Sequence, residues 1–476
     1  MSERQKAAFD LRITSERKLI KNFLEKDFDL PTIVERLGEP TYDNPLSEDE
    51  VGNYRPHDSF KVITADLEVI ETFIKANKKI PSFREAGPRS KFYFNPQSVR
   101  AGIVTTGGLA PGIHYVIHSI VKRHWDTYKI NKSAEGDIFG IYESFDGLTS
   151  KPMFYKTLDP DITEEWLDRG GCMLGMRRGT YHKDNDVDKY VNEILANLNR
   201  NHLNILYIIG GNGSLSLAHK IAKATSNISI VGIPKTMDND LLWVWNSFGF
   251  NTAVEKATEV VNTMHSEAQS TRRICIIELF GAESGFVAAN AALASGHVDL
   301  VLIPEPFKEL SKEECEKSLL KLLNHLLKIV SEKDTPHGIV VLAEGLGELF
   351  RQKEVMFEDI LVTGKGFIDQ LKNFLQKRAY DRAERKLDVF INQPRHNIRA
   401  INANSYDQIY CERLGALAVD NALAGYTDFM ISQWLTEYVL VPLELVSLGQ
   451  KSIPPGGIFW KQVINSTRQP NIGSKN

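Results

Sequence analysis

From residue 99 onward, the chain alternates short apolar runs with amphipathic stretches of helical length. Runs such as 101–106, 205–209 and 228–231 are largely apolar, which is typical of parallel strands buried on both faces. This alternation predicts an α/β chain whose parallel sheets carry helices on both faces. The predicted strands cover 101–106, 205–209, 228–231, 273–279, 298–303, 338–342, 389–392, 429–432 and 438–442. The predicted helices cover 116–124, 215–224, 248–269, 286–294, 312–332, 356–385 and 406–424.

Residues 1–95 differ from this pattern, because they are highly charged and interrupted by prolines. Two amphipathic stretches, 15–24 and 66–76, predict short helices. The intervening segment 38–56 is rich in proline, asparagine and acidic residues, which predicts a loop. Alone this extension has too little apolar surface to fold well, so we expect it to wrap a neighbouring domain or subunit.

Composition narrows the class of function. With 476 residues, the chain has room for two or three domains. The formal net charge of −4 is small, so nothing points to nucleic acid or to a membrane surface. No apolar run reaches about 18 residues, and no basic and apolar leader opens the chain, so we expect no membrane span and no secretion signal. The 4 scattered cysteines predict reduced thiols in a cytoplasmic protein.

The stretch 233–240 carries a concentration of reactive side chains directly after a predicted buried strand. It contains Lys235, Thr236, Asp238 and Asp240. Open α/β sheets bind ligands at the carboxyl ends of their strands. A lysine there can neutralise phosphate oxygens, one aspartate can accept a hydroxyl proton, and the other can hold Mg²⁺. The residues alone also fit a solvated turn, so the decision depends on other parts of the chain.

Two glycine turns join strands to helices. Gly107 and Gly108 follow the strand at 101–106, and the turn 210–214 follows the strand at 205–209. Glycines at such positions let backbone N–H groups approach phosphate oxygens at a helix N-terminus. Either turn alone is weak evidence, because tight turns need glycine for geometric reasons.

Charged residues elsewhere strengthen this interpretation. The glycine-bounded loop 170–179 carries Arg177 and Arg178, and arginine is suited to bidentate phosphate contacts. Glu305 and Glu344 also follow predicted strands, as Asp238 does. Since the carboxyl ends of parallel strands share one edge, we expect polar groups to gather there.

The motifs at 234–240 and 248–255 read Pro-Lys-Thr-x-Asp-Asn-Asp and Phe-Gly-Phe-x-Thr-Ala-Val-Glu. With them the chain resembles the 6-phosphofructokinase family, most closely the long ATP-dependent type of plants and trypanosomatids. The resemblance covers about 85–465. It implies transfer of a phosphoryl group from ATP to the 1-hydroxyl of fructose 6-phosphate, giving fructose 1,6-bisphosphate in glycolysis. It also implies a cytoplasmic homotetramer, or a mixed oligomer with a paralogue.

The resemblance implies the phosphofructokinase fold, which has two Rossmann-like parallel-sheet domains, here with an N-terminal extension. The expected parts are an extension at 1–95, a nucleotide and phosphate-donor domain at 96–245 plus about 400–445, a sugar-phosphate domain at 246–399, and a C-terminal segment at 446–476.

The family's roles carry over to matching positions. Asp238 resembles the catalytic base, and Asp240 the acidic partner that helps to hold Mg²⁺. Lys235 matches a contact to the transferred phosphate, Thr236 a contact to the acceptor, and Arg178 the arginine that stabilises the transferring phosphoryl group.

The acceptor side matches at five positions. Glu344 resembles the carboxylate that binds the sugar hydroxyls, and Gly281 falls among the substrate contacts. Arg273 resembles an arginine lent by a neighbouring subunit to the 6-phosphate, and His396 and Arg399 match the remaining pair on that phosphate. The nucleotide contacts implied by the resemblance are Gly107, Gly108, Arg178, Gly211, Asn212, Gly213 and Ser214. Asn212 and Asp240 are the implied metal ligands.

The donor side departs from the family. Asn212 replaces an aspartate that organises the metal, and Ala282 replaces an arginine near the donor phosphates. Leu217 replaces a second glycine, so we expect it to reshape the adenosine site, and His114 replaces an asparagine. The basic residue expected near Val389 is missing, although Lys386 or Arg395 could reach in. Gly213 nevertheless favours ATP over pyrophosphate, because a side chain there would crowd the α-phosphate.

These departures keep two alternatives open. One is a catalytically weakened regulatory paralogue that binds sugar phosphate. The other is a kinase of the same fold with another donor, such as pyrophosphate, or another acceptor. Loss of one preorganised charge contact typically lowers the rate of such a reaction by about 10²–10³-fold.

Overall fold

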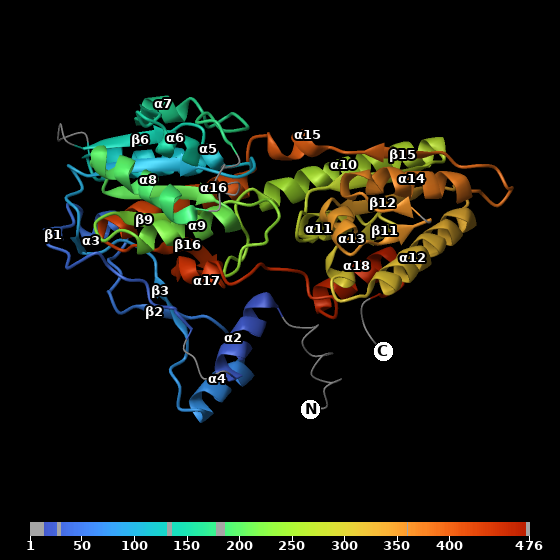
Figure 1. The fold of residues 1–476 in the computed structure, drawn as a ribbon, viewed down its shortest axis with the longest axis horizontal. Helices are drawn as coiled ribbons and strands as arrows, with labels where there is room; N and C mark the ends of the chain where they lie inside the picture. The colour runs from blue at the N-terminus through green and yellow to red at the C-terminus, as the bar shows by residue number, and fades with distance from the viewer. Residues whose placement is uncertain (1–13, 26–29, 131–135, 178–185, 359, 473–476) are drawn as a thin grey trace.

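The computed structural model describes residues 14–25, 30–130, 136–177, 186–358 and 360–472. Two mixed layers of helices and strands lie side by side, one around a nine-stranded sheet and one around a four-stranded sheet (Figure 1). The predicted α/β fold class with large parallel sheets is confirmed. The division of the chain into domains stays a prediction.

The larger sheet is parallel at its centre and antiparallel at both edges. All neighbours from β16 to β6 run parallel, whereas β7, β17, β3 and β2 pair antiparallel. In order across the sheet, the strands are β2 (Phe60–Val62), β3 (Ser82–Glu85), β17 (Glu437–Pro442), β16 (Phe429–Trp434), β9 (Ser229–Pro234), β8 (Ile205–Gly210), β5 (Arg100–Thr105), β6 (Asp137–Ile141) and β7 (Tyr155–Thr157).

Both faces of this sheet are buried, as its apolar runs predict. Neighbouring residues of one strand belong to opposite core clusters, for example Tyr207 on one face and Ile208 on the other. Helices α5 (Ile113–Lys122) and α16 (Ser405–Leu423) pack on each other over one face. Helices α8 (Val187–Arg200) and α9 (Asn212–Lys223) cover the other.

The smaller sheet is entirely parallel. Its order is β11 (Leu300–Leu302), β12 (Gly338–Ala343), β10 (Ile274–Leu279) and β15 (Val389–Asn392). Cys275 and Ile277 face the cluster shared with α10 (Phe250–Thr271) and α11 (Phe286–Ser295). Ile274 and Ile276 face the cluster formed with α12 (Lys312–Glu332) and α14 (Phe367–Arg378). Helix α10 extends from the larger sheet to the smaller one (Figure 1).

The remaining elements are short. The helices are α2 (Ser15–Glu25), α3 (Glu48–Val51), α4 (Leu67–Lys75), α6 (Phe145–Thr149), α7 (Pro160–Glu164), α13 (Gly345–Gln352), α15 (Arg395–Arg399), α17 (Leu443–Val446) and α18 (Ile458–Thr467). Within the described residues there are also a π-helical turn η1 (Arg123–Thr127) and the 3₁₀ turns η4 (Glu305–Phe307) and η5 (Gly364–Gly366). Two small ladders pair β1 (Tyr42–Asp43) with β4 (Lys91–Phe92), and β13 (Met356–Phe357) with β14 (Ile360–Leu361).

Two predictions about these elements are wrong. The helix expected at 356–385 is replaced by the β13–β14 ladder and the shorter α14, because Gly364 and Gly366 interrupt the pattern. The extension is also not only helix and loop, because β2 and β3 extend the larger sheet through β17. None of the helices in the described ranges combines the length and apolar character that crossing a membrane requires.

Candidate active site

The stretch after β9 folds into a compact loop at the carboxyl edge of the larger sheet. Asn239 adopts a left-handed conformation with φ of 51°, and its side-chain oxygen accepts a hydrogen bond from Ser247 N at 3.1 Å. Ser247 Oγ in turn donates to the backbone oxygen of Thr236 at 2.5 Å. We call residues 235–247 the catalytic loop. Its own side chains close it, which fixes the direction of Asp238 and Asp240.

Asp238 connects the two sheets. Its Oδ2 accepts a hydrogen bond from Ala282 N at 3.3 Å, and its backbone oxygen accepts one from Ser284 Oγ at 2.8 Å. Both donors lie in the turn after β10, so the carboxyl edges of β9 and β10 meet here. Burial raises the pKa of the Asp238 carboxyl to about 7, and the carboxylates of Asp240 and Glu344 add to that rise. A carboxylate with such a pKa is suited to accept a proton near neutral pH.

Lys235 lies beneath the first glycine turn. Its side chain is buried, and Nζ donates to the backbone oxygen of Gly108 at 2.6 Å. Gly107 has a φ of 86°, and a β-carbon there would lie 3.4 Å from Nζ. Burial lowers the pKa of Lys235 to about 8, although Cys172, Asp238 and Asp240 oppose the change. The structure therefore brings the first glycine turn and the catalytic loop together.

The second glycine turn meets Asp240. Asn212 Nδ2 donates to Asp240 Oδ2 at 2.9 Å, and Thr236 Oγ1 donates to Asp240 Oδ1 at 2.9 Å. Asn212 Oδ1 is buried and finds no hydrogen-bond partner among the described residues. The uncommitted Asn212 oxygen beside the Asp240 carboxylate provides oxygen ligands of the kind that hard divalent cations prefer. The other turn residue, Ser214, directs its hydroxyl to Thr106 Oγ1 at 3.3 Å.

Glu344 and Gly281 lie at the same edge of the smaller sheet. Glu344 follows β12, and its N–H donates to Leu279 O at 3.0 Å. Its carboxylate is close enough to raise the pKa of Asp238. Gly281 has a φ of 138°, and a β-carbon there would lie 2.2 Å from the Ser284 oxygen. The turn that binds Asp238 therefore requires glycine at position 281.

Helix α15 brings three basic residues beside this edge. The Arg399 guanidinium lies over the Phe280 ring, 5.6 Å from its centroid. His396 is exposed on the same helix. Arg395 Nη2 donates to Glu278 Oε2 at 2.7 Å, and Glu344 contributes to the raised pKa of Arg395. Arg395 thus lies close to Glu344, and it is one of the two residues that the sequence offered in place of the missing basic residue near Val389.

One predicted residue is not brought to this edge. Arg273 precedes β10 and so lies at the opposite end of that strand from Gly281. Its Nη1 lies 3.9 Å from Glu267 Oε1. Arg178 lies outside the described residues. Its neighbour Arg177 donates to Glu143 Oε1 at 3.2 Å.

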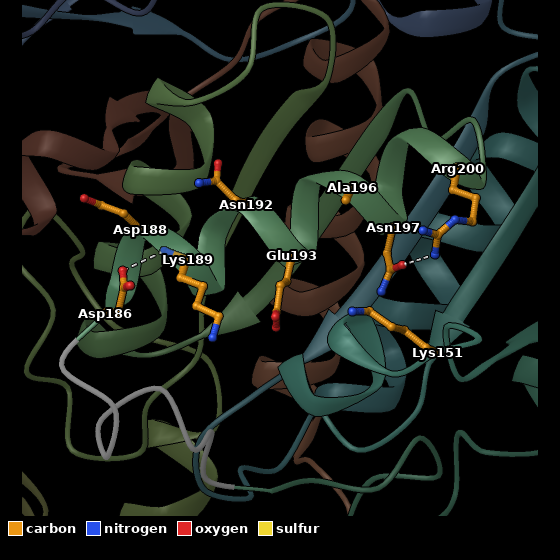
Figure 2. Close-up of a pocket in the computed structure, with 9 residues that line it drawn as sticks. All are labelled: Lys151, Asp186, Asp188, Lys189, Asn192, Glu193, Ala196, Asn197 and Arg200. Atoms are coloured by element: carbon orange, nitrogen blue, oxygen red, sulfur yellow. Dashed lines mark hydrogen bonds between the residues drawn. The ribbon is translucent and has the colours of Figure 1, made fainter.

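A surface hollow of about 450 Å³ runs along α8, where Lys189, Asn197 and other polar residues line it (Figure 2). It contains none of the predicted site residues.

Two substitutions have structural roles that the sequence did not reveal. Leu217 is 2 % exposed and packs in the core between α9 and the sheet, so the expectation that it reshapes the adenosine site is wrong. The period of the helix turns this side chain inward. His114 is buried: Nδ1 contacts Arg169 O at 3.0 Å and Nε2 accepts from Met173 N at 3.0 Å. It ties α5 to the loop at 169–173.

Sequence reasoning also missed Ser284, Glu278 and Lys451. Ser284 and Glu278 lie on either side of the turn after β10. Nothing in the sequence around them indicates a role, and their contacts to Asp238 and to Gln393 form only in the folded chain. Lys451 lies about 200 residues away along the chain, yet its Nζ donates to Asn239 Oδ1 at 2.9 Å. No local spacing links these positions, and only tertiary structure does.

Comparison with known proteins identifies relatives of the whole chain. A sequence model described as Phosphofructokinase matches residues 100–422. The ATP-dependent 6-phosphofructokinase of Borreliella burgdorferi is 34 % identical over 469 residues, covering 95 % of this chain and 99 % of the relative. The ATP-dependent 6-phosphofructokinase 5, chloroplastic, of Arabidopsis thaliana is 33 % identical over 396 residues, covering 81 % and 69 %.

Solved structures share the fold. Pichia pastoris phosphofructokinase in the T-state superposes with a TM-score of 0.59 at 21 % identity, covering 78 % of this chain and 37 % of that one. The pyrophosphate-dependent phosphofructokinase of Marinobacter aquaeolei gives 0.59 at 17 % identity, covering 78 % and 92 %. The match to the family model over most of the chain and the identity to full-length relatives lead to one conclusion: this chain belongs to the phosphofructokinase family.

Proposed function

We propose that this chain transfers the terminal phosphoryl group of ATP to the 1-hydroxyl of fructose 6-phosphate, giving fructose 1,6-bisphosphate and ADP in glycolysis. The relatives that match nearly all of the chain carry the name ATP-dependent 6-phosphofructokinase. The observation that carries the proposal is the place of Asp238, whose carboxylate lies at the meeting point of the two sheets with a pKa raised to about 7.

In this mechanism, Asp238 removes the proton from the attacking hydroxyl. The N–H of Ala282 and the hydroxyl of Ser284 hold the residue in place. The proton passes from the sugar oxygen to an Asp238 carboxylate oxygen as that sugar oxygen bonds to phosphorus and the bond to the ADP oxygen breaks. A base whose pKa lies near the working pH is efficient in both accepting and releasing the proton.

Positive charge and backbone donors hold the donor phosphates. We assign Lys235 and Arg178 to the transferring phosphoryl group, and the backbone N–H groups of Gly107, Gly108 and the turn 211–214 to the remaining phosphate oxygens. Lys235 is already anchored to the first glycine turn through Gly108. Desolvation of this lysine strengthens its interaction with a phosphate oxygen.

Kinases of this kind generally need a divalent cation, and we assign Mg²⁺ to Asn212 and Asp240. Asp240 has one hydrogen bond to each carboxylate oxygen, which leaves further lone pairs, and Asn212 Oδ1 is uncommitted within the described residues. When bound, Mg²⁺ neutralises charge on the phosphate oxygens. One carboxylate together with substrate phosphates is a common arrangement for this ion.

On the acceptor side we assign Thr236, Gly281 and Glu344 to the sugar, and His396 and Arg399 to the 6-phosphate. The position of Arg273, at the far end of β10, agrees with a contact to the sugar phosphate of a neighbouring subunit. We therefore propose a homotetramer that acts in the cytoplasm.

The departures on the donor side do not favour the two alternatives. Leu217 is a core residue, so one of the presumed changes to the nucleotide pocket is removed. Asn212 keeps an oxygen at the position of the missing aspartate, and Ala282 contributes its N–H to Asp238. The likeness to pyrophosphate-dependent structures, at 17 % identity, concerns the fold alone.

A coupled assay of fructose 1,6-bisphosphate formation tests the proposal, with fructose 6-phosphate and either ATP or pyrophosphate in parallel. We expect turnover with ATP and Mg²⁺ and at least tenfold less with pyrophosphate. Equal turnover with both donors would contradict the expected preference for ATP, and turnover with pyrophosphate but not with ATP would reject ATP as the donor. Calorimetric binding of fructose 6-phosphate without turnover with either donor would instead favour a regulatory paralogue.

A further inference from the structure

The segment between α17 and α18 crosses from the larger sheet to the smaller one next to the catalytic loop (Figure 1). We call its residues 451–453 the C-terminal strap. Two groups of Lys451 bond to the catalytic loop, and Ile453 N bonds to Glu305, whose carboxylate also accepts from the turn after β10. The strap therefore helps to hold the active site in place, although it lies outside the two motifs from which the site was predicted.

Lys451 holds the catalytic loop through both its backbone and its side chain. Its N–H donates to Asp240 O at 2.8 Å. Its Nζ donates to Asn239 Oδ1 at 2.9 Å, to Val244 O at 2.7 Å and to Trp245 O at 3.0 Å. An ammonium group has three protons, so each proton of Lys451 Nζ can pair with one of these three oxygens. The bonds join the two ends of the turn between Asp238 and Ser247.

The other end of the strap meets the turn that positions Asp238. Glu305 Oε1 accepts from Ile453 N at 3.2 Å and from Gly285 N at 2.9 Å. The neighbouring Ser284 donates to the Asp238 backbone oxygen at 2.8 Å. Glu305 is 3 % exposed, and burial raises its pKa. The buried carboxylate of Glu305 thus joins the strap to the turn after β10. The strap and this turn each also bond to the catalytic loop.

Desolvation of the Lys451 ammonium group costs free energy, which a residue that only fills space would not require. Burial lowers the pKa of Lys451 to about 8, and the carboxylates of Glu16 and Asp240 offset only part of that effect. Glu16 belongs to α2, whose first residue, Ser15, accepts a hydrogen bond from Ser452 N through Oγ at 3.2 Å. Burial of a charge adds little net stability, so the hydrogen bonds of Lys451 to the catalytic loop, and not its burial, are the basis for assigning it a role.

We propose that Lys451 is a positioning residue of the phosphoryl transfer, which keeps Asp238 and Asp240 in fixed orientation by bonding to Asn239, to the Asp240 backbone and to the backbone of the catalytic loop at 244–245. The kinetic part of this inference rests on the proposed function, whereas the structural part does not. In this structure the Lys451 ammonium bonds to three protein oxygens, so we assign its action to Asn239 and the backbone of Asp240 rather than to a substrate.

The test compares Lys451→Met with Lys451→Arg in the full chain, and Lys461→Met serves as the control, since Lys461 is an exposed lysine of the following helix. Hydrogen–deuterium exchange of peptides covering 236–247 reports the loop directly. We expect Lys451→Met to speed exchange there at least tenfold and to leave α8 unchanged. We expect kcat to fall at least tenfold, with KM for fructose 6-phosphate and ATP within threefold of the wild type.

Lys451→Arg should recover most of both effects, because arginine keeps the charge and the donors, and Lys461→Met should change nothing. Should Lys451→Met fail to fold, Lys451→Gln supplies two of the three donors without charge and should give a smaller change of the same sign. Wild-type exchange and kcat in Lys451→Gln or Lys451→Met would overturn the inference. Faster loop exchange in Lys451→Met together with an inactive wild type would reject the proposed function and leave the strap's role standing.

Discussion

The substitution Asp238→Asn removes the charge of the proposed base while keeping its size and one acceptor oxygen. The pKa of this carboxyl rises from 3.8 to about 7, because of burial and the nearby carboxylates of Asp240 and Glu344. The folded protein therefore keeps a proton at pH values where an unfolded aspartate has lost it. Stability falls as pH rises from about 4 to about 7, and the full cost is present above pH 7. Asp238→Asn should abolish that cost.

The magnitude follows from the two pKa values. One pKa unit corresponds to about 1.4 kcal/mol, so the difference between 3.8 and about 7 is about 4 kcal/mol in the free energy of unfolding. Unfolding entropy is about 2.1 cal/mol/K per residue, or about 1 kcal/mol/K for 476 residues. The melting temperature of the variant should therefore exceed that of the wild type by about 4 °C at pH 8.

Thermal unfolding followed by circular dichroism, in EDTA at pH 8 and pH 5, measures this difference. At pH 5 the wild-type carboxyl is largely protonated, so the gain should fall to less than half of its value at pH 8. The variant Asp334→Asn, which changes an aspartate whose side chain is 99 % exposed, should show no gain at either pH. Equal melting temperatures of wild type and Asp238→Asn at pH 8, or a gain that does not depend on pH, would refute the reasoning.

Three further predictions concern the same site. The profile of kcat/KM against pH should be bell-shaped, rising through about pH 7 as Asp238 loses its proton and falling above about pH 8 as Lys235 loses its charge; a flat profile between pH 6 and 9 would contradict both assignments. Asn212→Asp should tighten the Mg²⁺ dependence of the rate and lower the melting temperature in EDTA, because it places a second carboxylate against Asp240. Leu217→Ala should lower the free energy of unfolding by about 2–4 kcal/mol and leave KM for ATP within about twofold, whereas a large change in KM would return Leu217 to the nucleotide site.

The sequence predicted the parts of the fold that depend on local pattern. The apolar run at 228–231 identified the central strand β9, because an apolar run of this length between turn signals is typical of a strand buried on both faces. The helix at 312–332 was predicted with both ends correct from its periodic apolar stripe, and the structure shows in addition that Ser311 and Glu314 form a capping box at its start.

The misses depend on tertiary contacts. The direction of Leu217 is set by the rotation of α9 against the sheet, and a motif comparison does not show that rotation. The pairing of β3 with β17 joins residues more than 350 positions apart, as Val439 with Glu85 shows. The support that Lys451 gives to Asn239 likewise has no local signature. Motifs therefore pointed to residues that the structure gathers at one sheet edge, whereas the residues that hold them in place were visible only in three dimensions.

The most direct measurement is a rapid-quench assay of fructose 1,6-bisphosphate formation by Asp238→Asn, with ATP, Mg²⁺ and fructose 6-phosphate at saturating concentrations confirmed by calorimetry. If Asp238 is the base, both substrates bind with affinities close to those of the wild type, and phosphoryl transfer slows by at least about 10³-fold. Transfer at a rate within tenfold of the wild type, with both substrates bound, would contradict the account.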